Sequence, residues 1–380
     1  MLSKSMKIAI ICSNLFNISQ KALKGTEIFS ADLLNELAKN ADKNDLEITA
    51  FASGESNLAV KVESVDFKPS FNDSEIIDNG KHVLFELALL SKAFLQQGSF
   101  DLYHINIGDG DIALPFAPFV KKPILITLHH LIDANFTRKY FSLFKNYNNI
   151  FFISASNYQR NILPGLNYVA TIYHGVDGNT FEFDSEGGND IMWAGRAIPN
   201  KGMDLAVELA RRCKLKIKLF AIRKGNHDAW LETVLKQIKS QPDLISIKFD
   251  QERASLVGPF QKSKLFLFPI VWDEPFGLVL IESLACGTPV VAYAQGSVPE
   301  IIKDGETGFI VNNSKQDIRG DWVIKKTGIA GLCEAVEKIY SMPEGEYKKM
   351  RKACRDRFEK NFTIEKMIKE YEKLYQTFKV

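Results

Sequence analysis

The sequence predicts an α/β protein with two doubly wound, Rossmann-like domains. Short β-branched or aromatic runs alternate with longer stretches of helical period, which is typical of βαβ units and a mainly parallel sheet. The series restarts after a polar, glycine-containing stretch at residues 176–190. The length of 380 residues also fits roughly two domains with cores of their own.

The expected elements follow from that alternation. The strands of the first half are expected at residues 7–12, 46–52, 100–107, 123–129 and 149–156. Those of the second half are expected at residues 190–195, 216–222, 246–249, 264–269 and 289–293. Clear helical periods cover residues 30–41, 204–213 and 278–287, and an amphipathic helix is expected from about Glu344 to Val380. In such folds, ligands bind outside the carboxyl ends of the strands, in the cleft between the domains.

Composition excludes several classes of function. Lys plus Arg number 48 and Asp plus Glu 46, a net charge of +2 that gives no general field for nucleic acid. The five cysteines are scattered without a CxxC pair, so neither a disulfide framework nor a zinc site is expected, which suits a reducing cytosol. The first apolar run is interpreted as a buried strand rather than a signal peptide, and no segment has the length of a membrane span.

The most informative stretch runs from Lys264 to Tyr293. A buried strand is followed by the loop residues 273–277 and then by a helix that starts near Leu278. Glu274 precedes that helix and Glu282 lies inside it, about two turns along if the loop is nearly helical, so both carboxylates can face one ligand. Free backbone amides at the helix start suit sugar hydroxyls or phosphate oxygens. As an alternative, Glu274 only caps the helix and Glu282 is only solvated.

At this point the sequence resembles the family-four retaining glycosyltransferases of GT-B architecture. EPFGLVLIE resembles their Glu-x7-Glu element and is followed by ACGTPVVA and GSVPEIIKDGETGFIV. AGRAIPNKG, HGVDGNTF, KGTEIFSADLLNELA and ITLHH are similar to further segments of the family, in the family's order over nearly the whole chain. The resemblance implies an acceptor-side domain at residues 1–175, a nucleotide-sugar domain at 176–360 and a helix at 361–380 that crosses back to the first domain.

The resemblance also implies roles in the second domain for a nucleotide diphosphate sugar as co-substrate. Arg196 and Lys201 would hold the diphosphate, where two fixed cations meet growing negative charge. Glu274 would contact the transferred sugar, and Glu282 would accept hydrogen bonds from the ribose. Phe276, Gly277 and Leu278 would bind the donor sugar through their backbone amides. As an alternative, Arg196 and Lys201 are two solvated cations of a loop and bind no ligand.

In the first domain the resemblance implies two further site residues. Gly25 would let the backbone approach phosphate because it lacks a Cβ, although Lys24 stands where the family often has a second glycine. His129 would act in catalysis by hydrogen-bonding the donor sugar, although a lone histidine at a strand end is usually structural. His130 follows where the family often has Asp.

Three further features leave alternatives open. Asp109 and Asp111 could hold a divalent cation, but a polar turn is favoured and no metal or other cofactor is expected. Asp133 is the only nearby candidate for a carboxylate nucleophile and equally a turn residue. The segment at residues 136–145 could contact anionic lipid through Arg138, Lys139 and Lys145. Burial of Phe141, Leu143 and Phe144 against the sheet is favoured.

The resemblance therefore implies a retaining hexosyltransferase of glycan, glycolipid or glycoconjugate biosynthesis, which we expect to be metal-independent. Its donor would be a UDP- or GDP-sugar, and its acceptor would be a sugar, a lipid-linked molecule or another small molecule. Its expected location is the cytoplasm, with peripheral contact at the inner membrane face as an option, and no nucleic-acid partner is expected. The alternative function is a non-catalytic sugar-nucleotide-binding subunit of a glycosyltransferase complex.

Overall fold

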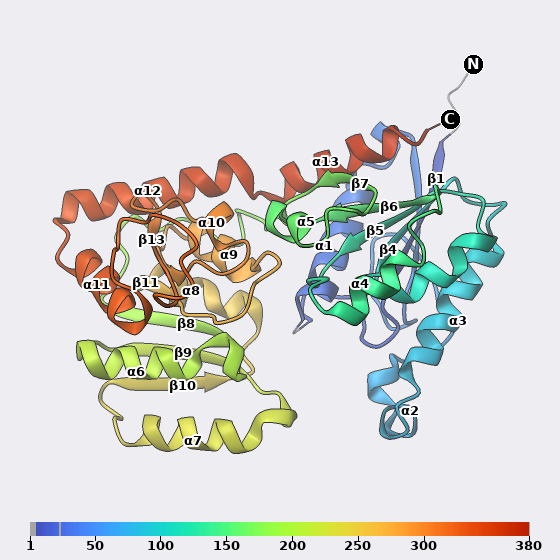
Figure 1. Cartoon of the computed structure of the whole chain (residues 1–380). Helices are drawn as coiled ribbons and strands as arrows, with labels where there is room; N and C mark the ends of the chain where they lie inside the picture. The colour runs from blue at the N-terminus through green and yellow to red at the C-terminus, as the bar shows by residue number, and fades with distance from the viewer. Residues whose placement is uncertain (1–4, 23, 380) are drawn as a thin grey trace. The chain divides into compact units, whose positions relative to one another are not determined.

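A computed structural model describes residues 5–22 and 24–379 of the chain (Figure 1). The chain divides into two compact units, and each contains one sheet. Unit 1 comprises Met1–His174 and Ile364–Val380, and unit 2 comprises Gly175–Thr363. All strand pairs within the two sheets are parallel, so the predicted fold class, two doubly wound α/β domains, is confirmed.

The sheet of unit 1 has the order β3-β2-β1-β4-β5-β6-β7. Its strands are β1 (Met6–Cys12), β2 (Leu46–Phe51), β3 (Lys61–Glu63), β4 (Leu102–Asn106), β5 (Ile124–Leu128), β6 (Ile150–Ser154) and β7 (Tyr168–Thr171). Its helices are α1 (Gly25–Asn40), α2 (Ser74–Asp78), α3 (His82–Leu95), α4 (Asn135–Ser142), α5 (Asn157–Ile162) and α13 (Ile364–Gln376). Short 3-10 turns are η1 (Asp42–Asn44), η2 (Ser70–Asn72) and η3 (Asp111–Phe119).

The two faces of this sheet carry separate apolar layers. Strand residues such as Ile10 and Leu125 pack with α1 and α13 in one cluster. The alternate strand residues, including Ile105 and Ile126, pack with α3 and η3 in the other. The helix expected from Glu344 onwards is in fact two helices, because the chain leaves helical geometry at Phe362 and restarts at Ile364. The second of these, α13, packs against α1 within unit 1.

The sheet of unit 2 has the order β10-β9-β8-β11-β12-β13. Its strands are β8 (Asp190–Arg196), β9 (Ile217–Ile222), β10 (Ile245–Phe249), β11 (Ser263–Phe268), β12 (Val290–Tyr293) and β13 (Gly308–Val311). Its helices are α6 (Met203–Cys213), α7 (Asp228–Lys239), α8 (Val257–Gln261), α9 (Leu278–Ala285), α10 (Val298–Ile301), α11 (Gly328–Tyr340) and α12 (Glu344–Asn361). Its 3-10 turns are η4 (Pro199–Lys201), η5 (Gly225–His227) and η6 (Arg253–Leu256).

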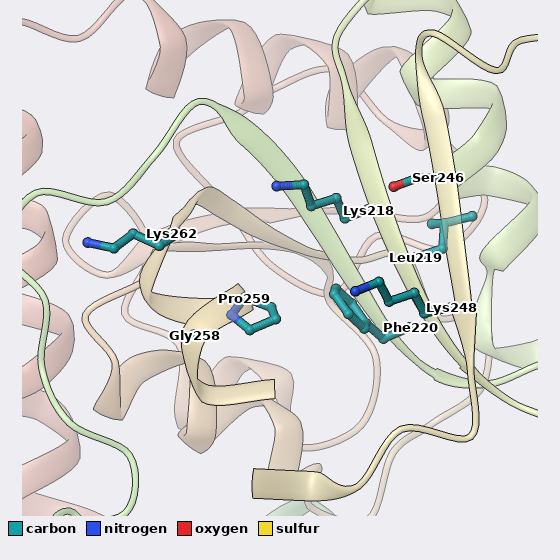
Figure 2. Close-up of a pocket in the computed structure, with 8 residues that line it drawn as sticks. All are labelled: Lys218, Leu219, Phe220, Ser246, Lys248, Gly258, Pro259 and Lys262. Atoms are coloured by element: carbon teal, nitrogen blue, oxygen red, sulfur yellow. The ribbon is translucent and has the colours of Figure 1, made fainter. Parts of the chain in front are cut away.

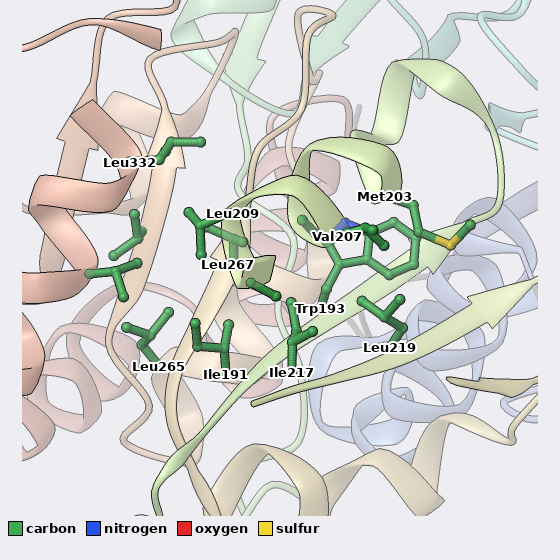
Figure 3. Packing of buried hydrophobic residues seen from close by; sticks show 14 of the residues in the cluster. Ile191, Trp193, Met203, Val207, Leu209, Ile217, Leu219, Leu265, Leu267 and Leu332 are labelled. Atoms are coloured by element: carbon green, nitrogen blue, oxygen red, sulfur yellow. The ribbon is translucent and has the colours of Figure 1, made fainter. Parts of the chain in front are cut away.

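The core of unit 2 lies between its sheet and the helices α6, α7 and α11 (Figure 3). Trp193 of β8 is fully buried there beside Met203 and Val207 of α6. On the opposite face, Phe260 of α8 packs edge-on against Phe266 of β11, with 5.3 Å between the ring centroids. Burial on both faces explains why these strands read as nearly continuous apolar runs.

All of the strands expected from the sequence are present, and three short strands were not predicted. β3, β7 and β13 have three or four residues each and lie at sheet edges, where little apolar pattern is required. β13 also begins at Gly308, where a Cβ atom would lie 1.9 Å from the carbonyl oxygen of Val290. Only glycine permits that approach between neighbouring strands.

Candidate active site

The candidate site of unit 2 lies where the strand order reverses, between β8 and β11. The connections from these neighbouring strands lead in opposite directions, to β9 and to β12, so a crevice is expected at their carboxyl ends. Arg196 is the last residue of β8, and η4 with Lys201 follows it. The loop after β11 carries Glu274. The strands thus deliver two cations and one carboxylate to the same edge of the sheet.

Buried contacts fix the turn that carries Lys201. The indole Nε1 of Trp193 donates to the carbonyl oxygen of Lys201 at 3.1 Å. Gly202 has a φ of +68°, and a Cβ on it would lie 2.1 Å from the carbonyl oxygen of Pro269. The η4 turn therefore docks against the end of β11, and a glycine at position 202 is required both by conformation and by space.

Lys201 and Glu274 meet directly at this point. The Nζ of Lys201 lies 2.5 Å from Oε2 of Glu274, and both side chains are close to nine-tenths buried. The indole Nε1 of Trp272 donates to the same oxygen at 3.1 Å. The ring of Trp272 also lies 4.9 Å from the ammonium of Lys201, a cation–π distance. This arrangement differs from the alternatives in which Lys201 is a solvated loop cation and Glu274 is only a helix cap.

The loop that carries Glu274 is held by the segment after β12. The backbone N–H of Ser297 donates to the carbonyl oxygen of Glu274 at 2.9 Å, and its hydroxyl donates to that of Phe276 at 2.7 Å. The backbone N–H of Gly296 donates to Asp273 at 2.8 Å. A Cβ on Gly296 would lie 2.3 Å from the carbonyl oxygen of Glu274. Backbone hydrogen bonds therefore set the position of the carboxylate.

Glu282 faces a different cation from Glu274. It lies in α9 with its side chain 3% exposed, and the Nε of Arg253 in η6 donates to its Oε1 at 2.6 Å. The loop before α9 is not helical, because the helix begins only at Leu278. The expectation that the loop continues the helical spacing between the two glutamates is therefore wrong, and each carboxylate is placed by its own cation.

The segment that leads into α9 contains Phe276, Gly277 and Leu278, which are expected to bind a sugar through their backbone amides. Gly277 has a φ of +92°, which bends the chain into the helix. Leu278 opens the helix and is partly exposed. The side chain of Phe276 is buried, with 6.1 Å between its ring centroid and that of Phe362. Any contact of Phe276 with a sugar is therefore left to its backbone.

In unit 1, the reversal of strand order lies between β1 and β4. His129 follows β5, next to β4, and its Nε2 lies 3.2 Å from Oδ1 of Asn106 at the end of β4. Its ring packs edge-on against Phe29 of α1 at 4.9 Å. Burial, with smaller contributions from His174, His130 and His104, lowers the pKa of His129 well below its usual value. The imidazole is therefore neutral near pH 7 and available for hydrogen bonding.

The loop after β1 leads to Gly25, which is exposed and opens α1. The ammonium of Lys24, the residue that departs from the family pattern, lies 3.4 Å from the ring centroid of Phe16. The start of the loop is held by the buried carboxylate of Glu86, which accepts from the backbone N–H of Asn14 at 2.9 Å. Burial raises the pKa of Glu86 despite these hydrogen bonds.

The acidic pair at Asp109 and Asp111 sits in a turn. Oδ1 of Asp111 accepts from the backbone N–H of Ile112 at 2.8 Å, and Oδ1 of Asp109 lies 3.8 Å from Nδ1 of His130. Asp133, the candidate nucleophile, is exposed. Among the residues that the structure describes, no group of three or more His, Cys, Asp or Glu side chains is arranged to hold a metal ion.

A shallow depression of about 330 Å³ lies elsewhere in unit 2, on the sheet face beside α8 (Figure 2). It is lined by Lys218, Leu219, Phe220, Ser246, Lys248, Gly258, Pro259 and Lys262. None of these is a candidate site residue. Lys218 and Lys262 form ion pairs with Asp190 and Asp184, as is common for surface lysines.

Three residues that contact candidate site residues were not singled out from the sequence. Trp272 stands two residues before Glu274 in the sequence, and an indole donor so close to a candidate carboxylate could have indicated this contact. Arg253 of η6 reaches Glu282 and Asn106 of β4 reaches His129, and no local sequence pattern marks either partner.

Each of the two units contains a parallel Rossmann-like sheet, and cations and carboxylates lie at carboxyl ends of the strands. Two such sheets are the fold class of the GT-B glycosyltransferases. Residues 180–355, which lie within unit 2, match the family profile "Glycosyl transferases group 1". The matched segment is less than half of the chain, so the match shows a similarity of unit 2 to this family.

Individual relatives agree with this class. The chain is similar to an uncharacterized glycosyltransferase of Methanocaldococcus jannaschii, 24% identical over 84% of this chain and 92% of the relative. It is 33% identical to a D-inositol 3-phosphate glycosyltransferase of Mycobacterium leprae over 33% of this chain and 29% of that protein. A crystal structure of Anabaena HepE in complex with UDP and glucose has a TM-score of 0.74 at 14% identity, covering 98% of this chain and 100% of that chain.

No helix in residues 5–22 and 24–379 combines the length and the apolar character needed to cross a bilayer.

Proposed function

We propose that the protein is a retaining glycosyltransferase of family four, with EPFGLVLIE as its Glu-x7-Glu element. It transfers a hexose-type sugar from a nucleotide diphosphate sugar to an acceptor hydroxyl in glycan, glycolipid or glycoconjugate biosynthesis. The observation that carries the proposal is the 2.5 Å contact between Lys201 and Glu274 at the strand-order reversal of unit 2. It supports the proposal because one ligand could reach both the cation, to which we assign the diphosphate, and the carboxylate, to which we assign the sugar.

The chemistry of transfer explains why both charges are needed there. Negative charge grows on the diphosphate as the glycosidic bond to phosphate breaks, so Arg196 and Lys201 stabilise the departing group. Glu274 accepts hydrogen bonds from sugar hydroxyls, and Glu282 accepts them from the ribose. UDP is the first donor nucleotide to test, because the HepE complex contains UDP.

The proposed mechanism retains the anomeric configuration without a carboxylate nucleophile. The acceptor attacks from the side on which the nucleotide departs, and a phosphate oxygen of the leaving group takes the acceptor proton. The exposed position of Asp133 gives no support to a covalent intermediate at that residue. In this proposal the protein contributes position and electrostatic stabilisation, and His129 and Gly25 keep the roles that the resemblance implies.

In this proposal the protein acts in the cytoplasm, and α4 contacts an anionic lipid surface. Phe136 and Leu143 are 78% and 65% exposed, beside the exposed cations Arg138 and Lys139. Burial of Leu143 against the sheet, which the sequence favoured, is therefore wrong, whereas Phe141 is buried as expected. Flotation with vesicles that contain anionic lipid should carry the protein upward, and an Arg138→Ala, Lys139→Ala variant should float less. Absence of flotation by the unchanged protein would refute the lipid contact.

Nucleotide sugars provide the direct test of the activity. The protein should bind one of UDP-, GDP- or ADP-glucose in a thermal-shift panel and hydrolyse it slowly without acceptor. NMR of the sugar product formed with an acceptor should show the donor's anomeric configuration. Binding without any turnover would instead favour a non-catalytic subunit, and an inverted product would refute retention.

A further inference from the structure

A buried hydrogen-bond network in unit 1 links the C-terminal helix α13 to His129. Its members lie on β4, β5 and α13, and each is at most 1% exposed: His104, Asn106, Thr127, Tyr371 and Tyr375. They interrupt the apolar layer that α1 and α13 form with the sheet. Polar side chains in such a layer are costly unless each is hydrogen-bonded, so their presence calls for a specific use.

The strand register places these polar groups in one patch. Ile105 of β4 pairs with Ile126 of β5, so the next positions, Asn106 and Thr127, are neighbours. His104 lies two residues before Asn106 and therefore on the same face. The ends of the two strands thus present a histidine, an amide and a hydroxyl toward α13.

The hydrogen bonds of this patch have a consistent direction. Nδ1 of His104 lies 2.7 Å from the hydroxyl of Tyr375, and its Nε2 lies 2.7 Å from Oγ1 of Thr127. The hydroxyl of Tyr371 lies 3.2 Å from Oγ1 of Thr127. The amide Nδ2 of Asn106 lies 3.5 Å from Nε2 of His104 and can only donate to it. The Nδ1 of His104 therefore carries the proton and donates to Tyr375.

At the other end, Asn106 controls His129. The amide oxygen Oδ1 of Asn106 can only accept, so the Nε2 of His129, 3.2 Å away, carries a proton and donates it. The edge contact with Phe29 at 4.9 Å limits rotation of the ring. In the neutral imidazole, Nε2 therefore donates to Asn106, and Nδ1 remains as a hydrogen-bond acceptor.

We propose that Asn106 is the positioning residue of His129: it keeps the proton on Nε2 and leaves Nδ1 to accept a hydrogen bond from a hydroxyl of the bound sugar. The contact of its Nδ2 with Nε2 of His104 holds Asn106 in this orientation. The nature of the ligand rests on the proposed glycosyl transfer, whereas the state of the ring does not.

Nitrogen-15 NMR of the ligand-free protein with labelled histidine tests the state of the ring. The chain has 6 histidines, and His129→Gln assigns the signal. At pH 7.5 the unchanged protein should show the Nε2–H form of His129, and Asn106→Leu should shift the ring toward a mixture of both forms. Observation of the Nδ1–H form in the unchanged protein, or of an identical spectrum in Asn106→Leu, would overturn the proposal.

Two further variants guard against misfolding and indirect effects. Asn106→Asp keeps an acceptor oxygen and adds a negative charge, so the Nε2–H form should persist and the pKa of His129 should rise. An unchanged pKa of His129 in Asn106→Asp would count against direct contact.

Tyr371→Phe removes one hydroxyl from the far end of the network without touching Asn106, and it should leave the His129 signals in place. Loss of the Nε2–H form in that control would contradict the assigned role of Asn106.

Kinetics separate this proposal from the proposed function. With an active donor, Asn106→Leu should lower kcat at least tenfold and change KM by less than threefold, and Asn106→Asp should recover part of kcat. If the ring state responds as expected but no nucleotide sugar is turned over by the unchanged protein, the proposed function fails and the positioning stands. If turnover is normal and Asn106→Leu changes neither ring nor kcat, the positioning fails and the function stands.

Discussion

The ammonium of Lys201 lies 2.5 Å from the carboxylate of Glu274, although the two residues are 73 positions apart in the sequence. The contact joins the turn after β8 to the loop after β11. Without a ligand, Lys201 and Glu274 neutralise each other. In the proposed complex, Lys201 would pair with the diphosphate and Glu274 would accept hydrogen bonds from the sugar.

Substitution of Lys201 should separate binding from transfer. Lys201→Met should weaken UDP binding tenfold or more, because a charge-assisted hydrogen bond contributes about 1.5–3 kcal/mol. Glu274→Ala should leave UDP affinity within a few-fold and mainly lower the transfer rate, since the proposed function assigns its carboxylate to the sugar. Calorimetry with UDP and a turnover assay provide the two readouts. Equal effects of both substitutions on affinity and rate would contradict the assigned roles.

Glu282 should prove necessary both for stability and for nucleotide binding. Its carboxylate and the Arg253 guanidinium form a mostly buried pair at 2.6 Å, and removal of one partner from such a pair costs about 3–5 kcal/mol. Glu282→Ala should therefore lower Tm and also weaken UDP binding at temperatures where the variant is folded. Arg253→Gln is the matched control, because it removes the same pair and keeps the carboxylate for the ribose. If it weakens UDP binding as much as Glu282→Ala, contact of Glu282 with the ribose is refuted.

A single methyl group at position 202 should disturb the diphosphate site. Gly202→Ala places a Cβ 2.1 Å from the carbonyl oxygen of Pro269 at a φ of +68°, so the turn that carries Lys201 must shift. We expect a lower Tm and at least a tenfold loss of UDP affinity. Gly345→Ala in α12, where an added Cβ meets nothing within 4 Å, should leave both properties unchanged or raise Tm slightly. Normal affinity in Gly202→Ala would argue against the role of this turn.

The stability of the protein should depend on the protonation of His104. Burial lowers its pKa from 6.5 to about 3. Above pH 6.5 the ring is neutral in both states; as the pH falls below that value, only the unfolded chain binds a proton and stability is lost. The expected slope is about 1.4 kcal/mol per pH unit for this one residue. Urea unfolding at pH 7.5 and 5.5, compared with the variant His104→Gln, isolates its share from that of Glu86, and equal pH dependence in both proteins would contradict it.

The fold could be predicted because burial on both faces leaves a strong pattern in the sequence. β11 and β12 are continuous apolar runs, and α6 has a clear helical period, so sequence and structure agree there. The C-terminal break could not be predicted, because Phe362 is buried and continues the apolar stripe across the gap between α12 and α13.

The sequence and its resemblance to a known family pointed to candidate residues that stand in short motifs, such as Glu274 and Glu282 in the stretch after β11. The contact partners of the candidate residues stand outside those motifs. Arg253 of η6 reaches Glu282 across 29 positions, and Asn106 of β4 reaches His129 across 23. Such pairs depend on the order of strands in the sheet, which the local sequence does not state.

Turnover should persist without a divalent cation. The acidic pair that the sequence offered as a metal candidate, Asp109 and Asp111, lies in unit 1, and Asp111 accepts from the backbone N–H of Ile112 at 2.8 Å, as a turn residue does. Excess EDTA should therefore leave donor hydrolysis or transfer within about twofold of the untreated rate, because the proposed mechanism assigns the positive charge at the diphosphate to Arg196 and Lys201. Asp109→Asn is the matched variant and should retain full turnover. Activity that EDTA abolishes and Mn²⁺ restores, together with loss of activity in Asp109→Asn, would instead assign a metal to this turn.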